Sequence, residues 1–169
     1  WLLTRAMGGV KIKVGHAGTL DPLASGVMVV CTGRATKQID TLQAGVKEYI
    51  ATLRLGATTP SFDLEHPIDH TYATCHIDHQ LVETQLKKFI GDIWQTPPAF
   101  SAVKVDGKRA YDLARKGKEV ELKPKLLRID ELELLDCALA GAEKFLTIRV
   151  VCSKGTYIRA LARDIGEAL

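Results

Sequence analysis

A two-residue alternation of apolar and polar positions marks three segments of the chain as strands. The alternation is clearest in residues 47–55, and it returns in residues 126–137 and 145–152. Successive side chains of a strand point to opposite faces, so this period is typical of a strand with one buried face. The first of these segments is expected to bury four residues: Tyr49, Ala51, Leu53 and Leu55.

Apolar residues at helical spacing predict two amphipathic helices. One follows Asp78, its expected N-cap, and ends at Gly91; the other follows Thr156, its expected N-cap, and runs to the end of the chain. Shorter elements are also expected. These are a strand over 27–32, a helix over 35–42, a loop or small ribbon over 56–72, a strand over 101–105 turning at 106–107, and a helix over 110–116.

The order of these elements predicts an α+β fold. Strands and helices alternate too irregularly for repeated βαβ units, so we expect a mixed, mainly antiparallel sheet flanked by helices. No internal repeat or linker divides the 169 residues, which favours one domain over 1–169.

Composition narrows the class of protein. With 46% hydrophobic and 25% charged residues the chain is typical of a globular protein and unlike a disordered one. The longest apolar run, 27–31, is far too short for a membrane span, and no secretory leader is visible. Four widely spaced cysteines favour a reduced, cytoplasmic protein. The histidines and the cysteine within 66–79 match no zinc spacing, so we expect a polar loop there and no metal.

The net charge of +3 hides two basic blocks. Residues 1–59 carry +4 and residues 97–128 carry +5, whereas 60–96 carry −4 and 129–169 carry −2. In the second block Phe100 and Tyr111 lie among nine Lys and Arg residues, a pattern that suits a nucleic-acid backbone. A solvated hairpin or helix face is the alternative interpretation of that block.

A glycine-rich segment over 15–26 presents a single carboxylate, Asp21, close to His16. Asp21 followed by Pro22 is a common start for a helix, with the aspartate as its N-cap. The segment could equally present the carboxylate as a reactive group, and the two interpretations are compatible. No Gly-Lys-Ser/Thr follows, so nucleoside triphosphate binding lacks support.

A second unusual segment, 153–159, joins a strand to the last helix and contains Tyr157 and Arg159. The helix dipole disfavours an arginine near a helix start, which suggests another task for Arg159, such as pairing an acid. A pair with Asp21 would keep that carboxylate ionised at neutral pH. The alternative is an exposed arginine.

Six segments in order resemble the TruB family of tRNA pseudouridine synthases. They are VGHAGTLDPLASG (14–26), GRATK (33–37), KEY (47–49), LGATT (55–59), PPAFSAVK (97–104) and KGTYIR (154–159). The resemblance runs from about residue 11 to the last residue. It implies an isomerase that converts the T-loop uridine at position 55 of tRNA to pseudouridine without a cofactor, as a monomer that binds the T-arm.

The resemblance also implies roles for six residues. Asp21 would be the catalytic aspartate, attacking either C1′ of the ribose or C6 of the base. Tyr49 would stack on the target base and Tyr157 would be a second active-site tyrosine, with Arg159 beside them. His16 would help to hold the opened T-loop, and Lys104 would contact phosphate.

The same resemblance predicts the domain organisation. Residues 1–169 would be a catalytic domain incomplete at both ends, with a thumb-like RNA-binding insertion over about 97–125 and a C-terminal PUA-type domain absent from this chain. Two other hypotheses stay open at this stage. One is a non-catalytic RNA-binding module, and the other is a guide-RNA-dependent synthase.

Overall fold

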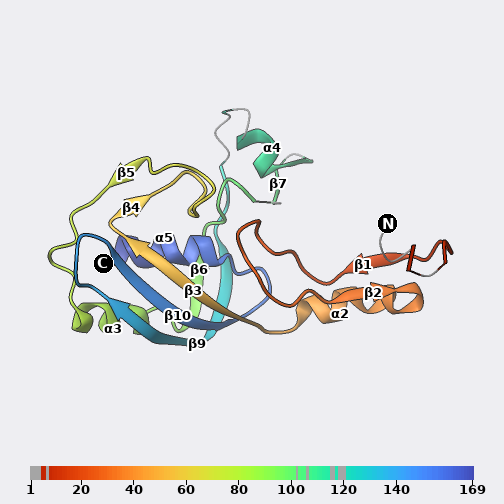
Figure 1. Cartoon of the computed structure of the whole chain (residues 1–169), viewed down its shortest axis with the longest axis horizontal. Coiled ribbons are helices and arrows are strands. Elements are labelled where there is room, and N and C mark those ends of the chain that lie inside the picture. Colours follow the sequence, from red (N-terminus) through yellow and green to blue (C-terminus); the bar gives the residue numbers. More distant parts are fainter. Residues whose placement is uncertain (1–4, 7, 102, 106, 115–116, 118–120) are drawn as a thin grey trace. The chain divides into compact units, whose positions relative to one another are not determined.

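The computed structural model describes residues 5–6, 8–101, 103–105, 107–114, 117 and 121–169. The chain divides into two compact units, Trp1–Gly45 and Val46–Leu169, which we call unit 1 and unit 2. Their elements are labelled in Figure 1. Among the described residues no helix is long and apolar enough to cross a membrane.

A four-stranded antiparallel sheet forms the frame of unit 2. Its strand order is β3 (Lys47–Leu55), β10 (Lys144–Cys152), β9 (Lys125–Ala138) and β6 (Gly91–Gln95). The three long strands match the segments predicted from alternation to within one residue. Along β3 the register pairs Tyr49 with Val150 of β10.

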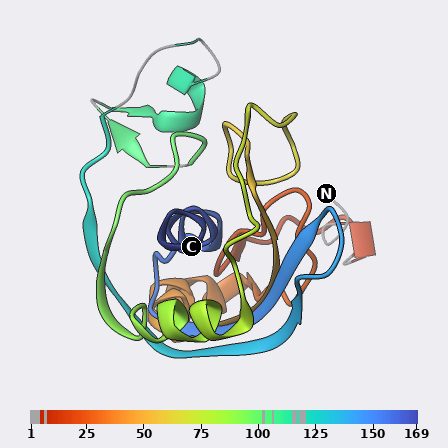
Figure 2. The ribbon, with the colours of Figure 1, turned by 90° about the vertical axis from the view of Figure 1, so that its left-hand side faces the viewer.

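Two helices cover one face of this sheet. α3 (His79–Lys87) packs against β9, α5 (Ile158–Ala168) packs against β3, and the helices touch each other. Figure 2, in which α5 is seen end-on, shows both helices above the sheet. Twelve buried residues form the core between them: Leu53, Leu55, Ile77, Val82, Leu86, Ile129, Leu146, Ile148, Val150, Cys152, Leu161 and Ile165.

Charged residues occupy the other face of the sheet. The Arg149 side chain reaches Glu48 of β3 at 2.5 Å and Glu131 of β9 at 2.6 Å. These cross-strand pairs keep the guanidinium charged and raise the pKa of Arg149 above its usual value. The sheet therefore has one apolar face under the helices and one exposed face, on which charged residues lie beside exposed apolar ones such as Ile50 and Trp94.

Short elements complete unit 2. β4 (Ala57–Thr58) pairs with β5 (His70–Thr71), which confirms the small ribbon expected over 56–72. β7 (Lys104–Val105) pairs with β8 (Lys108–Arg109), and α4 (Ala110–Ala114) follows. The expected N-cap of α3 is confirmed, because the Asp78 carboxylate accepts a hydrogen bond from the Leu81 N–H at 2.8 Å.

Unit 1 is a small hairpin followed by helix. β1 (Val14–His16) pairs antiparallel with β2 (Val30–Thr32), and a 3₁₀ helix, η1 (Gly33–Gln38), leads into α2 (Ile39–Ala44). The strand expected over 27–32 is therefore half as long as predicted. Residues 27–28 lie in the open part of the hairpin loop, and Val27 is 92% exposed. The α+β class with antiparallel sheets is confirmed.

Candidate active site

Asp21 lies in the loop that joins β1 to β2. The Ala17 N–H donates to the Val29 carbonyl at 2.9 Å, and beyond this bond the chain opens into an exposed loop. The Ala24 N–H donates to the Asp21 carbonyl at 2.9 Å, which closes one turn with Pro22 at its second position. The helix considered after Asp21 is not formed, because one turn closed by one hydrogen bond does not offset the cost of nucleating a helix. Asp21 is instead an exposed residue of the loop.

Two glycines set the direction of the Asp21 loop. Gly18 and Gly26 both have φ of 152°, a backbone conformation that residues with a Cβ rarely adopt. They lie three residues before and five residues after Asp21. The glycines at positions 18 and 26 are thus explained by the backbone conformation that the loop adopts there.

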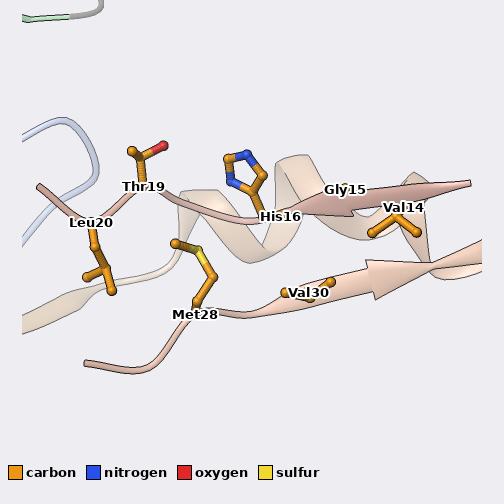
Figure 3. A pocket seen from close by; sticks show the side chains of 7 residues that line it. All are labelled: Val14, Gly15, His16, Thr19, Leu20, Met28 and Val30. Carbon is orange, nitrogen blue, oxygen red and sulfur yellow. The ribbon is translucent and has the colours of Figure 1, made fainter. Parts of the chain in front are cut away.

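A pocket of about 470 Å³ opens beside the start of the loop. Figure 3 shows the Leu20 and Met28 side chains in the space between the two arms of this loop. The His16 Nδ1 donates to the Gly18 carbonyl, so the proton of the neutral ring is on Nδ1 and Nε2 can accept. Seven residues line the pocket: Val14, Gly15, His16, Thr19, Leu20, Met28 and Val30.

In unit 2, Tyr49 lies in the middle of β3 on the face that carries the helices. It is half-buried and packs against the hydrophobic core. The alternation of β3 fixes this orientation, since Ala51 and Leu53 point to the same side. The tyrosine ring is therefore held by a strand rather than by a loop.

Tyr157 stands at the point where the chain enters α5. Its backbone is extended, with φ of −97° and ψ of 110°, and it is the N-cap of the helix. The expectation that Thr156 is the cap is wrong by one residue. The Thr156 hydroxyl donates to the Ser153 carbonyl at 3.0 Å, so it closes the preceding turn and does not receive a helical N–H.

Arg159, in the first turn of α5, is held by two loops of unit 2. Its guanidinium donates to the Ser61 carbonyl at 2.9 Å and to the Phe100 carbonyl at 3.1 Å. It also lies 3.6 Å from the Asp63 carboxylate, and the Arg159 and Asp63 side chains are only 13% and 14% exposed. The acid partner expected for this arginine exists within unit 2, and it is Asp63. A pair between Arg159 and Asp21 of unit 1 stays a prediction.

The carboxylate of Asp63 is itself held in place. It accepts from the Ser61 hydroxyl at 2.5 Å and from the Glu65 N–H at 3.0 Å. Ser61 is fully buried, and its hydroxyl is also 2.8 Å from the His66 Nδ1. Asp63 and Ser61 could not be identified from the sequence, because nothing in a polar loop 96 residues before Arg159 indicates that it is buried against a helix.

A second arginine of α5, Arg163, contacts the same loops. Arg163 donates to the Thr96 carbonyl at 3.1 Å, and its guanidinium lies 5.0 Å from the centre of the Phe62 ring. It also contacts the carboxylate of Asp164 at 2.6 Å. Burial raises the pKa of Asp164, and the charge of Arg163 opposes that shift. One face of α5 thus orders the segments around residues 61–63 and 96–100.

The comparisons with known proteins decide the family. The model described as "TruB family pseudouridylate synthase (N terminal domain)" matches residues 5–158. The chain belongs to the TruB family. The resemblance carried by the six motifs is confirmed, and with it the enzyme class, a pseudouridine synthase and hence an isomerase.

Curated relatives of the TruB family match nearly all of this chain. "tRNA pseudouridine synthase B" of Bacteroides fragilis is 70% identical over 99% of this chain and 70% of its own length. The protein of the same name from Bacteroides thetaiotaomicron is 69% identical with the same coverage, and that of Flavobacterium johnsoniae is 51% identical over 94% of this chain and 68% of its own. The chain thus spans about 70% of the length of the two Bacteroides proteins.

Solved structures extend the similarity to the fold. The "Crystal Structure of a Cbf5-Nop10-Gar1 Complex" matches with a TM-score of 0.67 and 28% identity, over 99% of this chain and 39% of that one. "Structure of H/ACA RNP bound to a substrate RNA containing 2'-deoxyuridine" matches with a TM-score of 0.63 and 23% identity, over 99% and 37%. The second likeness shows the fold alone.

The TruB assignment leaves the six candidate residues in two groups. Asp21 and His16 lie in unit 1, around the glycine-rich loop, and Tyr49, Tyr157 and Arg159 lie in unit 2 around β3 and α5. Lys104 lies in β7, and its side chain is outside the described part of the structure. Three basic residues of the 97–128 block fall outside the described residues: Arg115, Lys116 and Lys118.

The polar cluster at 66–79 shows no sign of a metal centre. Within the described part of the chain, no three His, Cys, Asp or Glu residues lie close enough together to hold an ion. His66 is bonded to Ser61, and its ring lies 4.8 Å from that of Phe100, whereas His76 contacts the Leu169 carbonyl at 2.6 Å. These histidines have structural contacts in separate places.

Proposed function

We propose that this chain isomerises the T-loop uridine at position 55 of tRNA to pseudouridine, with Asp21 as the nucleophile. The observation that carries the proposal is the 70% identity to a protein named tRNA pseudouridine synthase B over 99% of this chain. The structure supports it by presenting Asp21 on an exposed loop held by two glycines.

The reaction breaks the bond between N1 of uracil and C1′ of the ribose and forms a bond from C5 to C1′. The proton leaves C5 and N1 gains one, so atoms and charge balance without an oxidant, a reductant or a cofactor. An ionised Asp21 can begin the reaction by attack at C1′ or at C6, and either route needs an uncovered carboxylate.

The residues of unit 2 are proposed to receive the base. A uridine turned out of the T-loop loses its stacking, and an aromatic face compensates by about 1–3 kcal/mol per base. Tyr49 on β3 and Tyr157 at the start of α5 are proposed to supply such faces. Arg159 is proposed to pair with Asp21 as well as with Asp63. His16 is proposed to hold the opened T-loop through Nε2.

The basic block over 97–128 is proposed to grip the T-arm, with Lys104 on phosphate. Lysine and arginine displace counterions from the RNA backbone, which makes the affinity salt-dependent. We further propose that residues about 97–125 form a thumb-like insertion of one catalytic domain, and that a PUA-type domain belongs to the longer protein. A monomeric, cytoplasmic enzyme fits a free tRNA substrate.

A tritium-release assay tests the function. The full-length protein is incubated with T-arm RNA that carries tritium at C5 of uracil, and tritium in water is counted. We expect release by the wild type and by Asp40→Asn, a matched change of another exposed acid of unit 1, and none above background by Asp21→Asn. Equal release by Asp21→Asn would overturn the role of Asp21. Salt-sensitive binding without release by the wild type would indicate an RNA-binding module.

A guide-RNA-dependent synthase is the second candidate, because one solved structure that matches, at 28% identity, is a complex of Cbf5 with Nop10 and Gar1. The same assay separates the two candidates. Release from bare T-arm RNA with no added RNA or protein supports the stand-alone enzyme. Release only after addition of guide RNA and partner proteins would support the second candidate.

A further inference from the structure

Gln95 is a buried polar residue for which the proposed reaction so far provides no role. It is the last residue of β6, it is 1% exposed, and Thr96-Pro97-Pro98 follows it. A buried amide is expensive unless its donor and its acceptor are both satisfied. The contacts of Gln95 therefore indicate what the residue does.

Both ends of the Gln95 amide bond to the backbone of one residue, Tyr157. The Nε2 donates to the Tyr157 carbonyl at 3.2 Å, and the Oε1 accepts from the Tyr157 N–H at 2.9 Å. This is the hydrogen-bond pattern of two paired strands, with a side chain in place of one backbone. It joins positions 62 residues apart in the sequence.

The Tyr157 carbonyl also accepts the first hydrogen bond of α5, from the Leu161 N–H at 3.0 Å. The helix has no side-chain cap at this end. Gln95 thus fixes the N-cap residue from outside the helix, and so fixes where the helix starts. Tyr157 and Arg159, separated by one residue, take their positions from that start.

We infer that Gln95 is a positioning residue, which orients Tyr157 and the first turn of α5 toward the flipped base through this two-bond bridge. The inference rests on the proposed function, since it gives Tyr157 and Arg159 a base to meet. Glutamine suits the position because its amide carries one donor and one acceptor at the required distance. Ionised glutamate has no donor, and leucine has neither.

The substitution Gln95→Glu tests the bridge, because glutamate has the shape of glutamine but can donate a hydrogen bond only when its carboxyl is protonated. Above the pKa of the new carboxyl, two acceptors face the Tyr157 carbonyl. Below it, the protonated acid has one donor and one acceptor, as the amide has. Burial raises the pKa of a carboxyl, so protonation begins at a higher pH than in water.

The measurement is single-turnover tritium release by the full-length protein from pH 5.5 to 8.5, with T-arm affinity measured in parallel. At pH 8 we expect Gln95→Glu to lower the single-turnover rate by about tenfold or more while the dissociation constant changes by less than about threefold. As pH falls, the ratio of the variant rate to the wild-type rate should rise. The control is Gln80→Glu, a fully exposed position of α3, whose ratio should stay near one.

Two results would overturn the inference. One is a wild-type rate for Gln95→Glu at pH 8. The other is a loss of rate in Gln95→Glu that stays the same at every pH and that Gln95→Leu also shows. In this second case the loss of rate in Gln95→Leu would match its loss of folded protein in a urea titration. A double variant with Tyr157→Phe adds a second check, since a bridge that acts through Tyr157 predicts rate losses that are not additive.

Failure of the proposed function would look different. In that case the wild type itself releases no tritium, and the bridge is judged by hydrogen exchange of the Tyr157 amide. The readout is the protection factor, the exchange rate of an unstructured amide divided by that of the Tyr157 amide at the same pH. A high protection factor in the wild type that falls in Gln95→Glu at pH 8 and is restored at low pH supports the positioning role. Fast exchange in the wild type contradicts it.

Discussion

The Asp21 loop and the start of α5 satisfy their polar groups in opposite ways. Every residue from 21 to 30 is exposed, and the loop is shaped by glycine conformation and one turn. At the start of α5, side chains of Gln95, Arg159 and Arg163 bond to backbone carbonyls of distant segments, and Ser61 and Gln95 are at most 1% exposed. One region is open and the other is preorganised.

Under the proposed function, this difference suits separate tasks for the two regions. A nucleophilic carboxylate must be reachable by the substrate, and an exposed loop meets that need. Groups that orient a base must not move, and burial with several hydrogen bonds achieves that. Changes in the open loop should therefore affect the reaction, and changes at the α5 start should affect stability and positioning together.

The largest effect on stability is expected from Arg159→Met. The change leaves the Asp63 carboxylate and the carbonyls of Ser61 and Phe100 without their guanidinium, in a place that is nearly closed to water. Removing one partner from a buried ion pair costs about 3 kcal/mol or more of unfolding free energy. Urea titration followed by circular dichroism measures the loss.

The matched control is Arg54→Met on β3. Arg54 pairs with Glu143 at 2.9 Å, but both side chains are well exposed, at 38% and 54%. We expect its free energy of unfolding to change by less than about 1 kcal/mol. Equal losses from the two variants would contradict the assignment of the α5 start as the preorganised region.

A glycine-to-alanine change made in each unit sharpens the contrast. Gly56, which follows β3, has φ of 78°, and a Cβ there would lie 2.5 Å from the Thr74 Cγ2. Gly56→Ala is expected to lower the free energy of unfolding of unit 2 by about 1–3 kcal/mol. Gly18→Ala should leave that value unchanged and reduce the rate of tritium release, because it bends the Asp21 loop. A Gly18→Ala enzyme with the wild-type rate would argue that the loop conformation is unimportant.

Substitution of a lysine in the basic block over 97–128 should weaken RNA binding, whereas substitution of a lysine in α3 should not. Lys104→Gln is expected to weaken T-arm binding severalfold and to reduce the slope of log affinity against log salt by about one. Lys87→Gln, an exposed lysine of α3, is the control. The measurement is fluorescence anisotropy at several salt concentrations, and identical slopes for both variants would remove Lys104 from the RNA contact.

The smallest effect concerns pH and Asp164. Its pKa in the folded protein lies above the usual 3.8, mainly through burial, so the folded state holds this proton more tightly than the unfolded state. The protonated carboxyl of Asp164 therefore stabilises the folded state at pH values below the unfolded pKa. This stabilisation is lost as the pH rises through the folded pKa. Asp164→Asn should gain stability relative to the wild type between pH 4 and neutrality, by less than about 1 kcal/mol. A difference that falls with rising pH would contradict the burial argument.

The sequence predicted the elements whose own residues encode them. β3 and β10 alternate along their whole length, β9 alternates apart from two irregularities in its pairing with β10, and Asp78 caps α3 through a bond three residues away. β6 was missed because its pattern is inverted, with Gln95 buried and Trp94 69% exposed. A buried glutamine is explained only by its partner, Tyr157, which is far away in the sequence.

In the candidate site, too, the sequence predicted what local motifs encode and missed contacts between distant segments. Motifs identified Asp21, Tyr157 and Arg159 by type and order, and the family to which they belong is confirmed. Motifs did not identify Asp63 as the acid beside Arg159, because the pair depends on how a loop folds against α5. The roles of the motif residues in catalysis stay predictions.

The most direct test of the account is a parallel measurement on Asp21→Asn of three quantities: single-turnover tritium release, T-arm affinity and the free energy of unfolding. The account predicts that release falls to background, while affinity stays within about threefold and unfolding within about 0.5 kcal/mol of the wild type. Persistent release would contradict the account. So would a loss of release that merely accompanies a loss of binding or of folded protein.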